Sequence, residues 1–244
     1  TGNSENYPSR GTLQQTYDQI LADLEEAEKF VTRKGVSQSS SITTDVITAF
    51  KARVALGMKD YDTARIAAEA VIATKKYTLV SNATTYAEGW INDNLSETIF
   101  QLAMINSTEV GNAYSYFLYN SSGIEGRDNP QYIPEDWVLD LYDKNKDIRY
   151  AAYFDERTVT TPVVGKMTLL IKYPGNPKLY TKVTNYCNMP KVFRASEMYL
   201  IAAEAEYLSP NGSIAKANSY LNDLRKARIK GWSEKTYAGE ALMS

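Results

Sequence analysis

The chain has 244 residues, 43% of them hydrophobic, and a formal charge of −2, so it can bury a sizeable core but gives no electrostatic reason to expect nucleic acid or an anionic membrane as a partner. It contains no histidine, which excludes Ser-His-Asp and Cys-His catalysis and histidine-ligated zinc. Tyrosine is frequent, with 19 residues, and its flat apolar ring with a polar hydroxyl suits the faces and rims of sugar rings.

The first predicted element is a helix over residues 12–32. Thr12 and Gln15 have the spacing of a capping box, in which each side chain bonds to the other residue's backbone. The apolar residues that follow alternate steps of three and four: Leu13, Tyr17, Ile20, Leu24, Ala27 and Val31. This period is typical of one buried face of a helix.

Two further helices, over 44–57 and 60–75, are separated by a tight turn. The order of small and apolar residues is similar to that of a tetratricopeptide hairpin, in which a small residue of the second helix fits against the first. The residues that carry this order are Gly57, Tyr61, Ala64, Ala68 and Val71. We therefore expect an antiparallel helix pair.

The next segment, 78–189, does not continue the hairpins. A regular solenoid stacks its repeats directly, so we expect a separate, loop-rich insert with a few short strands. The predicted elements of the insert are a strand over Thr98 to Ile105, a polar loop over Asn106 to Asp136, a helix over 137–144 and a strand pair from Arg157 to Tyr173.

The polar loop holds the candidate glycan-binding residues. A loop of this length in a compact domain is usually functional or disordered, and its aromatic content argues against disorder. The candidates are tyrosines that could stack on sugar and nearby amide or guanidinium donors: Tyr114, Tyr116, Tyr119, Tyr132, Asn112, Asn120, Arg127 and Asn129. The alternative for any one tyrosine is that it packs the loop onto the scaffold.

Other conspicuous side chains are interpreted as structural. Trp137 lies one turn before Leu141, on the expected buried face of the 137–144 helix, and Trp90 precedes the first strand. Cys187 is the single cysteine, so it forms no intrachain disulfide, and we expect an unreactive packed thiol. The role of Trp232 stays open.

Three acidic or amide residues have the alternating spacing that opens a calcium loop: Asp143, Asn145 and Asp147. The sixth position is Ile148 instead of glycine, and the twelfth is Phe154 instead of glutamate. The sequence therefore predicts a solvated turn and no metal site.

A second hairpin ends the pattern, with helices over 194–209 and 213–229. Met198, Ile201, Ala205 and Leu208 form one apolar stripe, and Ala217, Leu221, Leu224 and Arg228 follow the same period. Each hairpin alone cannot cover its stripe, so we expect the two hairpins to pack as neighbours despite their distance in sequence.

Four segments carry a resemblance that goes beyond helical periodicity: FKARVALGMKDYDTARIAAEAVI (50–72), SETIFQL (96–102), WVLDLYDKNKDIRYAAYF (137–154) and FRASEMYLIAAEA (193–205). In this order they resemble the SusD/RagB family, surface glycan-binding lipoproteins of Bacteroidetes-type bacteria. The matches extend from about Thr12 to Gly231. The segment with Arg194, Glu197 and Glu204, the family's recurrent charged set, is the most specific.

The resemblance implies a mainly α, tetratricopeptide-like scaffold, with 1–77 and 190–232 as helical parts of a single 1–244 domain. It also implies a non-catalytic glycan-binding protein without a cofactor, lipid-anchored at the extracellular face of the outer membrane beside a TonB-dependent transporter. Because members carry further segments at both ends, including a signal peptide and a lipid-modified cysteine, we expect a central fragment.

Two points stay open. The charged set is interpreted as structural, with Arg194 and Glu197 paired on one helix face and Glu204 meeting Arg225 or Arg228 across the hairpin.

The alternative function is a tetratricopeptide-type protein–protein interaction scaffold, against which the long tyrosine-rich insert argues. An enzyme ranks third, because no Asp or Glu pair is distinguished from surface charge.

Overall fold

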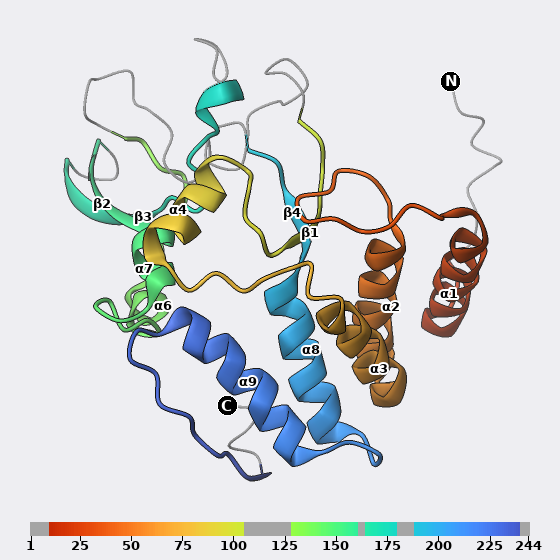
Figure 1. The fold of residues 1–244 in the computed structure, drawn as a ribbon. Helices are drawn as coiled ribbons and strands as arrows, with labels where there is room; N and C mark the ends of the chain where they lie inside the picture. Colours follow the sequence, from red (N-terminus) through yellow and green to blue (C-terminus); the bar gives the residue numbers. More distant parts are fainter. Residues whose placement is uncertain (1–9, 105–127, 161–163, 180–187, 240–244) are drawn as a thin grey trace, which may run out of the picture.

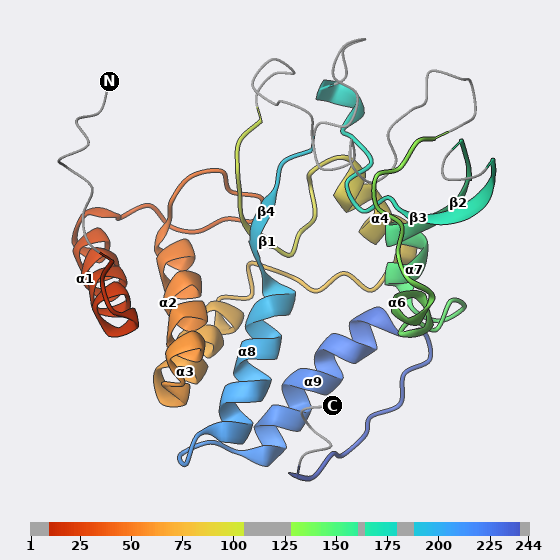
Figure 2. The same ribbon diagram turned by 180° about the vertical axis from the view of Figure 1, so that it is seen from behind.

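A computed structural model describes residues 10–104, 128–160, 164–179 and 188–239. Its main feature is a row of antiparallel helices, in which each helix contacts the next (Figures 1 and 2). In spatial order they are α1 (Leu13–Phe30), α2 (Thr44–Met58), α3 (Tyr61–Ala73), α8 (Ala195–Leu208) and α9 (Ile214–Arg228). The two hairpins therefore pack as neighbours through α3 and α8, which confirms that prediction.

The ends of these helices follow the sequence closely. Thr12 and Gln15 form the predicted capping box at the start of α1. Asp60 caps α3 by accepting a hydrogen bond from the backbone N–H of Thr63 at 3.1 Å. Lys59 adopts a left-handed φ of 63°, which ends α2 and starts the tight turn into α3.

Alanine fills the interface between the hairpins. Ala49, Ala52, Ala64, Ala68, Ala202 and Ala205 are all 0% exposed within one continuous core. Side chains this small bring the helix backbones close, so that any added methylene would meet a neighbouring helix.

The segment between α3 and α8 forms a second region, which lies along one side of the row, near the start of α8 and one end of α9 (Figure 1). Its elements are α4 (Ala83–Ile91), β1 (Thr98–Gln101), α6 (Asp136–Asp140), α7 (Ile148–Tyr153), β2 (Phe154–Val159), β3 (Gly165–Leu170), the short 3₁₀ helix Pro177–Leu179 and β4 (Lys191–Arg194). The sequence interpretation lacked α4 and α7.

Two small antiparallel sheets hold this region together. β1 pairs with β4, so Thr98 lies opposite Arg194 and the insert joins the scaffold where α8 begins. β2 pairs with β3 in regular register from Phe154–Leu170 to Val159–Gly165. The predicted strand over Thr98 to Ile105 is confirmed only for its first four residues.

A buried ion pair fastens the second region to α9. Arg228 donates hydrogen bonds through two of its nitrogens. Nη2 donates to the two carboxylate oxygens of Glu97 at 2.6 and 2.7 Å, and Nη1 donates to the carbonyl of Val80 at 2.8 Å. Glu97 also accepts from the backbone N–H of Val80 at 2.8 Å. The two charged side chains are at most 4% exposed.

The predicted pairing of the charged set was wrong. Glu197 pairs with Arg53 of α2, whose Nη2 lies 2.7 Å from Oε2, and not with Arg194. Arg228 is taken by Glu97, so it does not meet Glu204. Sequence spacing predicted partners within the α8–α9 hairpin. In the fold, the ion-pair partners of Glu197 and Arg228 are Arg53 and Glu97, which lie outside that hairpin.

The prediction that Trp137 is buried was also wrong. α6 ends at Asp140 and buries Leu139, while Trp137 and Leu141 are 66% and 70% exposed. The predicted solvated turn after α6 is confirmed at Asp143 and Asn145, which are exposed, but Asp147 is buried, caps α7 and pairs with Arg149 at 2.6 Å. Trp90 is 1% exposed, which confirms its structural role. Cys187 lies outside the described residues.

Candidate functional site

An open groove of about 370 Å³ lies on the second region. We call it the aromatic groove, and its lining residues are Tyr132, Ile133, Pro134, Val138, Tyr142, Tyr153, Phe154, Leu170 and Lys172. They come from the segment before α6, from α6 and α7 and the turn between them, from β2 and β3, and from the residues just after β3. Its lining is mostly aromatic and aliphatic, with one cationic side chain.

The wall of the groove is fixed by ring packing. The rings of Tyr142 and Phe154 meet edge to face with centroids 5.3 Å apart, and Tyr150 lies 5.4 Å from Phe154. The Tyr153 hydroxyl shares a buried hydrogen bond with the Tyr86 hydroxyl of α4. Burial is the main cause that raises the pKa of Tyr153 well above its usual value. The wall is thus preorganised and uncharged.

The structure places two of the predicted site residues. Tyr132 lines the groove and is 65% exposed. Asn129 is exposed three residues before it and does not line the groove. The other candidates lie outside the described residues: Asn112, Tyr114, Tyr116, Tyr119, Asn120 and Arg127.

Sequence reasoning missed most of the wall. Tyr142 fell within the predicted 137–144 helix, and Tyr153 and Phe154 fell after it, in the 137–154 segment that carries the family resemblance. The available signal was the recurrence of rings at Tyr142, Tyr150, Tyr153 and Phe154, which no single apolar face of a helix requires. Lys172 carried no sequence signal, because its environment arises from residues far away in the chain.

Behind the wall lies a core of aromatic side chains that includes Tyr86, Trp90 and Tyr153, here called the aromatic core. The Lys172 ammonium lies 4.6 Å from the centroid of the Trp90 ring and 4.7 Å from that of Tyr153. Lys191 and Arg194 approach the same indole at 5.1 and 5.2 Å. Three cations therefore surround one tryptophan.

Burial, together with the smaller effect of the nearby positive charges of Arg194, Lys191 and Arg149, lowers the pKa of Lys172 to about 8. Burial likewise lowers the pKa of Lys191, against the attraction of Asp93. Asp93 itself is buried and accepts from Lys191 at 2.9 Å. Lys172 is the titratable group of the groove whose charge changes near neutral pH.

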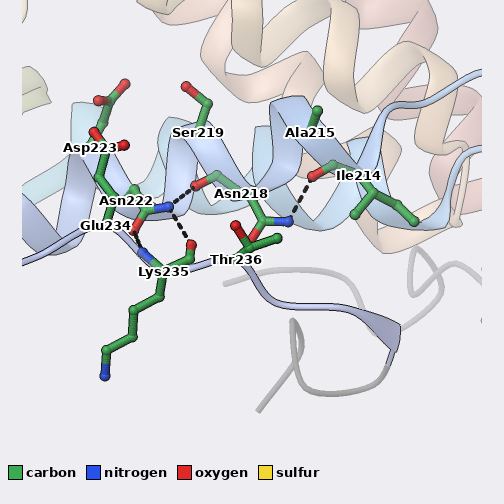
Figure 3. A pocket seen from close by; sticks show the side chains of 9 residues that line it. All are labelled: Ile214, Ala215, Asn218, Ser219, Asn222, Asp223, Glu234, Lys235 and Thr236. Carbon is green, nitrogen blue, oxygen red and sulfur yellow. Dashed lines mark hydrogen bonds between the residues drawn. The ribbon is translucent and has the colours of Figure 1, made fainter.

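A second groove, of about 460 Å³, lies along α9 (Figure 3). Asn218 donates to the Tyr237 carbonyl at 2.9 Å and accepts from its N–H at 2.7 Å. Asn222 makes the same pair of bonds with Lys235, at 2.7 and 3.0 Å. Two asparagines one helical turn apart thus hold alternate residues of an extended segment of the chain itself.

Metal and membrane features were also searched. Across the described ranges, no cluster of three acidic or cysteine side chains could hold a metal ion. Nor does any helix in those ranges have the length and apolar character needed to cross a bilayer.

Comparison with known proteins shows a likeness to the SusD superfamily. No family model matches the sequence. A SusD superfamily crystal structure from Bacteroides thetaiotaomicron superposes with a TM-score of 0.73 at 26% identity, covering 94% of this chain and 50% of that one. SusD-like protein P38 from Formosa agariphila is 31% identical over 87 residues, which are 36% of this chain and 17% of that protein. In sequence and in fold the chain is similar to proteins of the SusD superfamily.

The SusD-like chain is also similar to surface glycan-binding protein A from Bacteroides thetaiotaomicron, with a TM-score of 0.72 at 20% identity over 95% of this chain and 57% of that one. A likeness at this identity shows the shared fold. The chain spans about half the length of these solved relatives.

Proposed function

We propose that the protein binds a glycan, without catalysis, in the aromatic groove. The observation that carries the proposal is a rigid aromatic wall open to solvent, with Tyr132 at its rim 65% exposed. A sugar ring presents an apolar face to such a wall, and each Å² of apolar surface removed from water contributes about 25 cal/mol. The names of two similar proteins, one SusD-like and one surface glycan-binding, support the same ligand class.

We further propose that the native protein is lipid-anchored at the cell surface and works with a TonB-dependent outer-membrane transporter. The likeness to the SusD superfamily supports this assignment. The residues that precede Thr1 in the gene would test it, because a signal of about 20 residues ending in a lipobox cysteine is expected. A cytosolic N-terminus in the gene would contradict the surface location.

The binding test is isothermal titration of the native-length protein against a panel of neutral and acidic polysaccharides. Tyr132→Ala should weaken the best ligand about tenfold, because an exposed stacking ring contributes on the order of 1.4 kcal/mol. Tyr17→Ala, on α1 far from the groove, is the matched control and should leave the affinity unchanged. Silence across the panel together with tight binding of a peptide would refute glycan binding.

The groove along α9 favours the second candidate, a protein-interaction scaffold. Asn218 and Asn222 hold an extended backbone through paired amide bonds, which is how a helical surface can grip a peptide independently of its sequence (Figure 3). Their amides are occupied by Lys235 and Tyr237 of the same chain, so the aromatic groove is the better supported site.

A further inference from the structure

The charges of the aromatic core do not balance. Five basic side chains contact its rings or carbonyls, and three of them form ion pairs: Lys191 with Asp93 at 2.9 Å, Arg149 with Asp147 at 2.6 Å and Arg228 with Glu97 at 2.6 Å. Lys172 and Arg194 contact the Trp90 ring, and no carboxylate of the described residues forms an ion pair with either. Within the part of the chain that the structure describes, these two cations thus have no ion-pair partner.

The charge of Lys172 is costly where it lies. An ammonium in a poorly solvated site is normally paired, because transfer of an unpaired ion out of water is unfavourable. Contacts with the faces of Trp90 and Tyr153 compensate for part of this cost. The lowered pKa of Lys172, about 8, reflects the part that stays uncompensated.

One of the two cations is accessible from the groove. Lys172 lines it together with Tyr153, whose ring lies 4.7 Å from the ammonium. The other lining residues are uncharged. A ligand in the groove therefore meets an apolar, aromatic surface with a single positive charge and a second cation, Arg194, behind the same indole.

We propose that the aromatic groove selects an anionic glycan, one whose sugar carries a carboxylate or a sulfate ester that pairs with Lys172. This inference rests on the proposed glycan-binding function and adds the ligand's charge. The ring stacking would be shared by any sugar, whereas the anion would supply a partner for Lys172. Because the site is partly shielded from water, the pairing is stronger than it would be between exposed groups.

The test compares Lys172→Met with the native-length wild type by affinity electrophoresis on matched polysaccharides. Polygalacturonate is paired with its methyl ester, and dextran sulfate with dextran, so the two pairs separate carboxylate from sulfate recognition. Wild type should prefer the charged member at least tenfold. Lys172→Met should lose that preference, while Lys172→Arg should retain most of it.

The matched control is Lys166→Met. Lys166 lies on β3, which ends two residues before Lys172; it is 73% exposed, pairs with Glu156 and does not line the groove. Its removal changes the net charge by the same amount and should alter binding less than twofold. An equal loss in both variants would show general charge attraction and overturn the proposal.

The pH dependence supplies an independent reading with dextran sulfate, whose charge is constant. Wild-type affinity should fall between pH 7 and pH 9.5 as Lys172 loses its proton, and Lys172→Met should show no such fall. Other groups that face Lys172 are Trp90, Tyr153, Arg149, Lys191 and Arg194. Lys191 forms an ion pair with Asp93. Any titration of Lys191 would occur in both wild type and Lys172→Met, so the difference between the two proteins reports on Lys172 alone.

The outcomes separate this inference from the proposed function. Tyr132-dependent binding of the neutral members, unchanged by Lys172→Met, would overturn anion selection and leave glycan binding intact. Loss of stability in Lys172→Met without any change in charge preference would show a purely structural lysine. Silence toward every polysaccharide would overturn both.

Discussion

The helical row and the aromatic region solve the problem of burial in opposite ways. The row is filled by alanines that are 0% exposed, and its charged side chains lie mostly at its surface in pairs such as Lys29–Glu26. The aromatic region buries large rings and places five basic side chains against them. The first arrangement is optimised for stability, whereas the second retains unpaired charge of the kind expected where a ligand binds.

The strongest way to break this comparison is to remove the tie between the two regions. Glu97→Ala should lower the free energy of unfolding by about 3–5 kcal/mol, because it leaves Arg228 charged and buried without a partner. Urea denaturation would measure the loss. Glu26→Ala, which breaks an exposed pair on α1, should cost less than about 1 kcal/mol. Equal losses would contradict the distinction.

The comparison is sharpened by Lys172, whose charge is expected to destabilise the fold. Its pKa is about 8 in the folded state and about 10.4 in an unfolded chain. Below pH 8 both states are protonated and the cost is complete; between pH 8 and 10.4 the unfolded state holds more protons, so stability rises with pH. Lys172→Met removes this cost but also removes the contacts of the ammonium with the aromatic rings. The net effect that we expect is a free energy of unfolding about 2 kcal/mol higher at pH 7.

Thermal or urea unfolding between pH 7 and pH 10.5 would check this sign. The difference between wild type and Lys172→Met should shrink as the pH rises. A variant that is less stable than wild type across the whole range would show that the ring contacts outweigh the buried charge.

The smallest effect is expected at Trp137. The sequence interpretation buries it, but it is 66% exposed, so Trp137→Ser should change the free energy of unfolding by no more than about 0.5 kcal/mol. The matched substitution Trp90→Ser, in the aromatic core, should cost at least about 3 kcal/mol. Chemical denaturation of both variants would test the contrast.

The sequence was most informative where local and global preferences agree. Caps at Thr12 and Asp60 and the recurring alanines predicted the helices of the row to within about two residues at each end. The order of segments such as FRASEMYLIAAEA predicted the resemblance to SusD-like proteins that the comparisons show. It was less informative in the insert, where α4 and α7 were missed and Trp137 was misplaced.

What the sequence by itself determined is the helical scaffold, because helix caps and a 3.6-residue apolar period are local properties of the chain. The packing of the two hairpins followed from the same local pattern, since each left an apolar stripe to cover. Only the tertiary structure decided the partners of the charged residues and the place of Lys172. Those depend on contacts such as Arg53–Glu197 and Arg228–Glu97, which join residues 144 and 131 positions apart. No periodicity of the chain encodes such distances, and burial fixes the charge of a side chain only once the fold has formed.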